Sequence, residues 1–250
     1  MKVIFHNDFY QVYTHDPAAE SGRLESIIKE ISSIVTLIDA KPATETDIAA
    51  VHTPKHINYI KKQGLYDISA LASGAAIQAA TIALTEPSFA LIRPPGHHAS
   101  ANSSWGFCFF NHMAIAIEKL KSQNKIKTAF ILDFDLHYGD GNINILNSKE
   151  YVTILNPESH DRKNYLSDIQ TTLSNCNADI IGVSAGFDNH IEDWGGLLTT
   201  QDYYLIGKMV RETANKNNSG CFGLLEGGYN HKVLGLNVKA FIMGLMLMDY

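Results

Sequence analysis

Cysteine is scarce in this chain, and its three residues, Cys108, Cys176 and Cys221, lie far apart. A disulfide framework needs an even set of closely spaced cysteines, so we expect none and infer a reducing compartment. No apolar run reaches the length of a membrane span, and the run after Met1 is too short for a signal peptide. These absences predict a cytoplasmic protein with no membrane partner.

Basic runs are missing as well. The 20 Lys and Arg residues are outnumbered by 26 Asp and Glu residues, and the formal net charge is −6. Nucleic acid is not expected as a partner, because its binding depends on clustered cations that displace counterions from phosphates. The mild negative charge instead favours the approach of a cationic substrate, an effect that salt weakens. Repeats, linkers and low-complexity segments are also absent, so we predict one domain over residues 1–250.

The chain is rich in short apolar runs that alternate with helical patterns. The runs predict strands at residues 2–5, 88–92, 128–132, 151–155, 179–184 and 221–225. Helical patterns lie between them, and the last, from about residue 231, is apolar almost all round and is predicted to be buried or to meet a partner. Strands that alternate with helices are typical of βαβ units. We therefore predict an α/β fold with an open, mostly parallel sheet and helices on both faces.

One long helix is expected after Asp16. Asp16 and Pro17 form a helix-start pair, with Asp as the cap and Pro in the first turn. Apolar residues then recur at helical spacing as far as Ile38. Arg23 lies near the start of this helix, and its spacing alone predicts an exposed surface charge.

Polar residues follow four of the predicted strands. Each of these groups has an ordinary explanation when taken singly, such as a surface histidine pair, a helix cap or a glycine-rich turn. Parallel strands, however, bring their carboxyl ends to one edge of the sheet, which is where ligands bind in open α/β folds. Their joint occurrence therefore predicts a functional site, made of His97 and His98, the segment from Asp133 to Asp140, Asp188, and Tyr229.

Asp135, His137 and Asp188 are the candidate metal ligands. Zn²⁺ takes nitrogen and oxygen ligands, and a catalytic zinc keeps three protein ligands and an open position for water. An Asp-rich set also suits Fe²⁺, Mn²⁺ or Co²⁺, so the sequence leaves the choice of metal open.

Hydrolysis by an activated water also needs a general base and a general acid. His97 and His98 are suited to these roles if carboxylates orient their rings, and Asp133 and Asp140 are available for that purpose. Tyr229 could donate a hydrogen bond to the oxyanion.

These motifs resemble those of the histone deacetylase family, within the arginase–deacetylase superfamily. The resemblance covers most of the chain, and its Glu-Gly-Gly-Tyr form is closer to the class II and bacterial branches. The segments that carry it are Arg-Pro-Pro-Gly-His-His-Ala at 93–99, Gly-Phe-Cys at 106–108, Asp-Phe-Asp-Leu-His-Tyr-Gly-Asp-Gly at 133–141, Ser-Ala-Gly-Phe-Asp at 184–188 and Leu-Glu-Gly-Gly-Tyr at 225–229.

The resemblance implies a role for each residue of the site. It implies that zinc is held by Asp135, His137 and Asp188. It pairs His97 with Asp133 and His98 with Asp140, and it gives Tyr229 the role of polarising the carbonyl. It also implies that Gly106 and Phe107 line a tunnel for the acylated alkyl chain, and that Arg23 and Cys108 lie near an inner exit for acetate.

Three departures from the family pattern affect these expectations. A monovalent cation often lies beside the zinc, but the small hydroxyl residue that helps to hold it is replaced within the Ile-Leu-Asn sequence of 154–156, so this ion is doubtful here. Residues 156–174 lack the glycine-rich stretch that supplies a second tunnel aromatic. Tyr165 or His160 would substitute, or the mouth would be wider. Trp194-Gly195 stands where polyamine-selective members carry an acidic gatekeeper, just after Glu192-Asp193, so polyamine preference stays open.

We therefore expect a zinc-dependent amidohydrolase that removes acetyl or short acyl groups from alkylamines, such as acetyl-lysine peptides or acetylpolyamines. One alternative is an arginase-like ureohydrolase with two manganese ions, which requires more ligands than Asp188-Asn189-His190 supplies. The other is a non-catalytic acyl-lysine binding module, which would bind acetyl-lysine peptides without releasing acetate. Substrate, acyl length and oligomeric state, including a homo-oligomer, are left open by the sequence.

Overall fold

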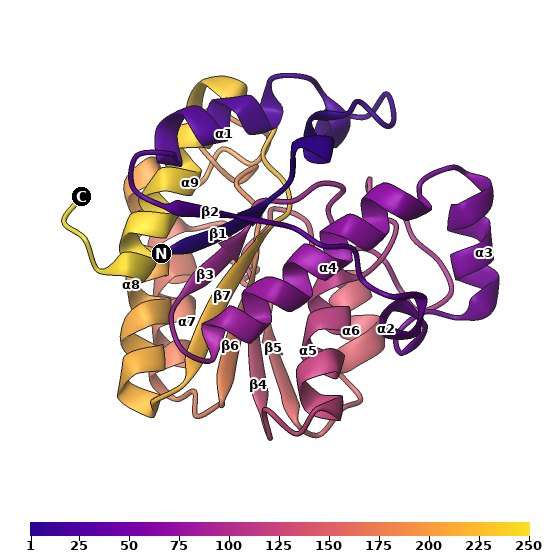
Figure 1. Cartoon of the computed structure of the whole chain (residues 1–250). Helices are drawn as coiled ribbons and strands as arrows, with labels where there is room; N and C mark the ends of the chain where they lie inside the picture. The colour runs from indigo at the N-terminus through magenta and orange to yellow at the C-terminus, as the bar shows by residue number, and fades with distance from the viewer.

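The computed structural model describes residues 1–250, arranged around a seven-stranded sheet (Figure 1). The strand order is β2-β1-β3-β7-β6-β4-β5, and all neighbouring strands pair in parallel. The predicted α/β fold with an open parallel sheet is confirmed. The strands are β1 (Lys2–Phe5), β2 (Thr36–Asp39), β3 (Ser88–Ala90), β4 (Ala129–Asp133), β5 (Val152–Leu155), β6 (Ile180–Ala185) and β7 (Gly220–Leu225).

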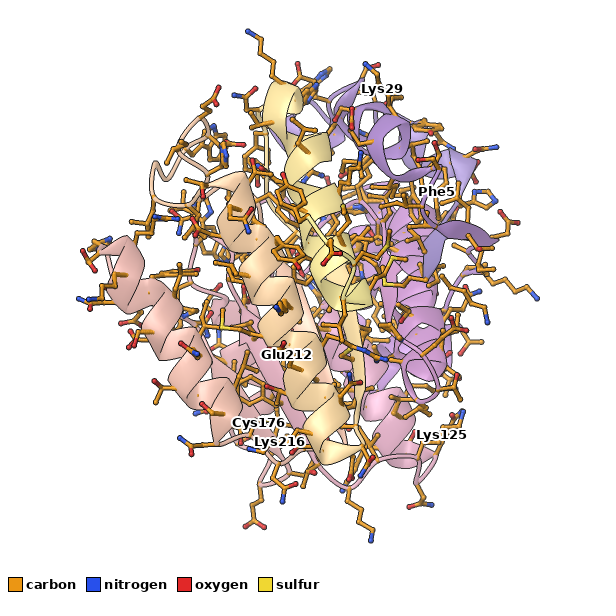
Figure 2. All side chains as sticks on the ribbon, turned by 90° about the vertical axis from the view of Figure 1, so that its left-hand side faces the viewer. Phe5, Lys29, Lys125, Cys176, Glu212 and Lys216 are labelled. Carbon is orange, nitrogen blue, oxygen red and sulfur yellow. The ribbon has the colours of Figure 1, made fainter.

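Helices cover both faces of the sheet. On one face α1, α9, α8 and α7 pack side by side (Figure 2), and α4 and α5 pack against each other on the other face. The α-helices are α1 (Arg23–Ile31), α2 (Glu45–Ala49), α3 (Pro54–Lys62), α4 (Tyr66–Ala83), α5 (His112–Ser122), α6 (Asp140–Leu146), α7 (Arg162–Ser174), α8 (Thr200–Asn217) and α9 (His231–Met246), and two short 3₁₀ helices are η1 (Asn7–Tyr10) and η2 (Pro17–Ala19). None of these helices combines the length and apolarity needed to cross a bilayer.

The central strands follow the sequence pattern closely. Every residue of β4, β6 and β7 is buried, as expected for parallel strands that are covered on both faces. The apolar final helix, α9, contacts α8 and α1, so its apolar surface is largely buried within this chain.

The long helix predicted after Asp16 is wrong. Asp16 caps the short helix η2, where its side chain accepts from the Ala19 amide, and α1 begins only after a left-handed turn at Gly22 and ends at Ile31. Ile38 belongs to β2, which pairs with β1 at the edge of the sheet. Most of β2 is exposed, so its pattern did not show the apolar run of a buried strand. The β-branched residues of β2 suit the strand, and pairing with β1 stabilises it.

The sheet order explains why distant segments meet. β3, β7, β6 and β4 are consecutive in the sheet, and these are the four strands that the polar groups follow. Because all four run in the same direction, their carboxyl ends deliver these groups to one edge.

Candidate active site

Three ligand-type side chains converge at this edge. Asp135 and His137 follow β4, and Asp188 follows the neighbouring strand β6. The His137 Nδ1 atom lies 3.2 Å from Asp135 Oδ1 and 3.2 Å from Asp188 Oδ2. One ligand atom from each residue lies within 4.8 Å of the others. The structure thus brings together the three residues that the sequence nominated as metal ligands.

The hydrogen bonds of the two carboxylates fit a bound cation. Asp188 Oδ1 accepts from the Leu136 amide at 3.1 Å, and Asp135 Oδ2 accepts from the Gly227 amide at 2.8 Å. Asp188 Oδ2 is buried and has no hydrogen bond, although it faces His137. An unpaired buried carboxylate oxygen is destabilising, and a divalent cation would satisfy it. Two carboxylates and one imidazole form a donor set that Zn²⁺ accepts.

Gly227 allows the backbone to approach these carboxylates closely. A Cβ atom at this position would lie 2.5 Å from Asp188 Oδ2 and 2.7 Å from Asp135 Oδ2. Both distances are shorter than a van der Waals contact, so a larger residue would displace the ligand oxygens. A glycine at position 227 therefore leaves the oxygens of Asp188 and Asp135 free to take their positions in the site.

Two histidine–carboxylate pairs lie beside the ligands. His97 Nδ1 is 3.2 Å from Asp133 Oδ2, and His98 Nδ1 is 2.7 Å from Asp140 Oδ1. The two imidazole rings lie 4.0 Å apart, centroid to centroid. These contacts match the pairing that the family resemblance implied.

The two histidines have opposite electrostatic environments. Burial disfavours the charged form of His97, but the carboxylates of Asp135 and Asp133 outweigh it and raise the pKa of His97 well above its ordinary value. Burial and the charge of His97 lower the pKa of His98 to about 4. A cation bound at Asp135 would offset part of the negative charge that acts on His97.

Glu226 is a site residue that the sequence analysis missed. It follows β7, and its Oε2 accepts from the amides of Gly96 at 2.6 Å and His97 at 3.2 Å. Glu226 therefore holds the loop that carries His97 and His98 against the end of β7. Its Oε1 is buried without a hydrogen bond. The Glu226 carboxylate also forms a cluster with His97 and Cys108. Burial raises the pKa of Glu226 to about 7. Two signals were available in the sequence: Glu226 follows a predicted strand, and it belongs to the Leu-Glu-Gly-Gly-Tyr motif at 225–229.

Arg23 is fully buried, so the surface charge expected from its spacing is wrong. Its Nε donates to the Gly228 carbonyl at 2.8 Å and its NH2 group to the Glu226 carbonyl at 2.6 Å. These carbonyls take the place of water around the guanidinium. The group also lies 5.5 Å from the centre of the Tyr229 ring. Helical spacing cannot reveal such partners, because they are more than 200 positions away along the chain.

Cys108 lies close to His97 and Glu226. It is buried, and its Sγ accepts from the His98 amide at 3.4 Å. Burial raises the pKa of the Cys108 thiol well above its ordinary value.

Aromatic rings surround Tyr229. Phe107, held at a positive φ of 67° after Gly106, meets the Tyr229 ring edge-on with centroids 6.1 Å apart. Trp194 stacks on Tyr229 at 4.1 Å and meets the His137 ring at 6.1 Å. Trp194 therefore stands beside the site as a second large aromatic.

Neither residue suggested as the second tunnel aromatic lies against Tyr229. Tyr165 is buried and donates its hydroxyl to the Phe134 carbonyl at 3.1 Å. His160 is exposed and lines a cavity of about 640 Å³ that also borders Asp135 and Gly195. The sequence suggested Tyr165 and His160 because they lie in the shortened segment, but Trp194 comes from the loop after β6.

A family model for the histone deacetylase domain matches two overlapping segments of the chain, residues 61–166 and 155–245. The chain belongs to the histone deacetylase family.

Relatives of known name match most of the chain. It is 29% identical to a probable deacetylase of Methanothermobacter thermautotrophicus, over 97% of this chain and 90% of the relative. It is 31% identical to histone deacetylase 14, chloroplastic, of Arabidopsis thaliana, over 86% of this chain and 67% of the relative. The crystal structure of the HDA15 HD domain has the same fold, with a TM-score of 0.87, 22% sequence identity and coverage of 98% of this chain and 89% of that one.

Proposed function

We propose that this histone deacetylase family member is a zinc-dependent amidohydrolase that removes acetyl or short acyl groups from alkylamines. Acetyl-lysine in peptides and acetylpolyamines are the substrate classes. The observation that carries the proposal is the convergence of Asp135, His137 and Asp188 beside two histidine–carboxylate pairs. A deacetylase activity also agrees with the names of the relatives.

The metal would be held by the two carboxylates and the imidazole of this set. When bound, a divalent cation there polarises an amide carbonyl and lowers the pKa of a water from roughly 16 towards 7. Fe²⁺, Mn²⁺ and Co²⁺ suit the same donors. The monovalent cation is not part of the proposal.

His97 and His98 move the protons. Each ring has a carboxylate at its Nδ1, which places the proton of the neutral ring on Nδ1 and leaves Nε2 as an acceptor. One histidine takes a proton from the attacking water, and one gives a proton to the departing amine. Asp133 and Asp140 orient the rings, because a ring fixed at Nδ1 cannot rotate away from the substrate.

Tyr229 stabilises the oxyanion. Burial and the negative charge of Asp135 raise the pKa of Tyr229, so its phenol stays protonated at neutral pH and can donate. A donor aimed at the developing oxyanion is worth about 3–4 kcal/mol in related chemistry.

The surrounding residues select the substrate and release the acid. In this proposal Gly106, Phe107 and Trp194 would line the path of the substrate's methylene groups, which the contacts of the Phe107 and Trp194 rings with Tyr229 support. Arg23 and Cys108 would stand near the exit for acetate, where the guanidinium charge would favour the carboxylate product; the contact of Arg23 with the Gly228 carbonyl, next to Tyr229, supports this role. We take residues 1–250 as one catalytic domain and retain the cytoplasmic location expected from the sequence.

Acetate release tests the proposal directly. The zinc-loaded protein is given a panel of acetyl-lysine peptides and acetylpolyamines, with chelator-treated protein and the His98→Ala variant as controls. We expect release with at least one class and loss of release in both controls. Peptide binding without acetate release would overturn the proposal in favour of a binding module, and urea release from a guanidino substrate would favour a ureohydrolase.

A further inference from the structure

A carboxylate outside the set described above holds the turn that carries Tyr229. Asp193 Oδ2 accepts from two consecutive backbone amides, those of Tyr229 and Asn230, each at 2.8 Å. Its Oδ1 accepts from the Trp194 amide at 2.9 Å. We infer that Asp193 is a positioning residue for the reaction, acting through the phenol of Tyr229. This inference rests on the proposed function.

The turn needs such a restraint. Gly228 has a φ of +114°, a conformation that few residues other than glycine adopt, so the turn before Tyr229 gains no rigidity from its own side chains. Arg23 holds the turn through the Gly228 carbonyl. Asp193 holds it through the two amides that follow. Charged acceptors form stronger hydrogen bonds than neutral ones, and here one oxygen serves both amides.

The same loop links Tyr229 to the metal ligands. Asp193 follows Asp188 by five positions, and the Gly195 amide between Asp193 and α8 donates to the Asp188 carbonyl at 2.8 Å. Asn230 adds a second tie, because its side-chain amide donates to the Glu192 carbonyl at 2.6 Å. The loop after β6 therefore ties the backbone of Tyr229 to the segment that carries the Asp188 ligand.

The side chain next to Asp193 fixes the ring itself. Trp194 stacks on Tyr229 with an interplanar angle of 27°, while Asp193 fixes the Tyr229 backbone. Backbone and ring are thus restrained by two adjacent residues. Misplacing a reacting group by about 1 Å can lower a rate by roughly a hundredfold.

The first measurement compares Asp193→Ala with Asp193→Asn. We expect Asp193→Ala to lower kcat by roughly 10- to 100-fold, with KM and zinc content within about twofold of the wild type. Asn keeps an oxygen that can accept from both amides, so Asp193→Asn should recover most of kcat. If the role of Asp193 were purely structural, Asp193→Ala would lower the melting temperature, but kcat would not fall selectively while KM stays unchanged.

The chain contains a matched control at the opposite end of the sheet. Asp179 Oδ2 likewise accepts from two consecutive amides, those of Lys127 at 2.5 Å and Thr128 at 3.0 Å, just before β4 and far from the site. We expect Asp179→Ala to lower the melting temperature and to leave kcat unchanged. An equal loss of kcat in Asp179→Ala and Asp193→Ala would overturn the inference.

The second measurement repeats Asp193→Ala in a Tyr229→Phe background. If Asp193 acts only by placing the hydroxyl of Tyr229, the second substitution should change kcat by less than about twofold once that hydroxyl is gone. A further loss as large as in the wild-type background would show that Asp193 acts by another route and would overturn the inference.

A crystal structure of Asp193→Ala gives a readout that needs no activity. We expect the Tyr229 ring to move from its stacked position on Trp194, and to keep that position in Asp179→Ala. An unmoved ring would overturn the inference even if acetate release is established. If the wild type releases no acetate but the ring moves, the proposed function fails and the positional link between Asp193 and Tyr229 stands.

Discussion

Trp105 and Asp140 are joined by a hydrogen bond at the mouth of the site, from the Trp105 Nε1 atom to Asp140 Oδ2 at 2.9 Å. The other oxygen of Asp140 contacts His98, and the Trp105 ring lies over the His98 ring with centroids 3.8 Å apart. Trp105 is 55% exposed, so burial alone does not explain its position. It supports both members of the His98–Asp140 pair.

We expect Trp105→Phe to lower kcat by roughly 3- to 10-fold, because a ring remains over His98 but the hydrogen bond that orients Asp140 is lost. Steady-state kinetics on the best acetylated substrate would measure this. Tyr138→Phe is the matched control, since Tyr138 is also an exposed aromatic, and it contacts Asp140 through its backbone carbonyl, which accepts from the Asp140 amide and which the substitution leaves in place. Unchanged kcat in Trp105→Phe would contradict the supporting role.

Removal of a ligand should remove the metal. We expect about one zinc per wild-type chain and much less in Asp188→Ala, because the remaining two ligands hold zinc weakly. Metal content after dialysis would be measured by elemental analysis, with the exposed Asp168→Ala on α7 as a control that keeps its zinc. Two metal ions per wild-type chain would instead favour the ureohydrolase alternative.

Loss of the Tyr229 hydroxyl should slow the chemical step. We expect Tyr229→Phe to lower kcat by roughly 100- to 1,000-fold with little change in KM, because the phenol donates mainly to charge that develops in the transition state. Zinc content should stay at the wild-type level, since Tyr229 is not among the ligands. An unaffected rate would contradict the role of Tyr229.

We expect the contribution of the buried His112 to the free energy of unfolding to depend on pH. Its Nδ1 contacts the Ser73 hydroxyl, its Nε2 contacts the Pro94 carbonyl, and burial lowers the pKa of His112 to about 4. In the unfolded chain the imidazole of His112 takes up a proton near pH 6.5. The stability that the neutral imidazole contributes is therefore complete above that pH, declines as the pH falls and is gone near pH 4.

The substitution His112→Gln isolates this effect, because Gln does not titrate. We expect its destabilisation, measured by urea unfolding, to be about 2 kcal/mol smaller at pH 5 than at pH 7.5. Comparing the variant with the wild type cancels the titration of all other groups. Equal destabilisation at the two pH values would show that His112 is not held in its neutral form.

The buried parallel strands were predictable because burial on both faces requires an unbroken run of apolar residues in the sequence. In β4, β6 and β7 every position avoids water, so each reads as a continuous apolar run, and the polar residues that follow stand out. The edge strand β2 leaves no such trace, because most of it is exposed and its apolar residues continued a helical spacing. The candidate ligands could be named for the same reason, since they directly follow buried strands.

The supporting residues could not be found in this way. Arg23, Asp193 and Glu226 all act by hydrogen bonds to backbone groups that are distant along the chain, and such partners leave no periodic pattern near the residue itself. The local sequence pattern determines that the sheet is parallel and which side chains lie at its edge. The order of the strands places β3, β7, β6 and β4 side by side, and so decides which backbone groups hold those side chains in place. Only the tertiary structure decides that order, because it arises from contacts between segments far apart in sequence.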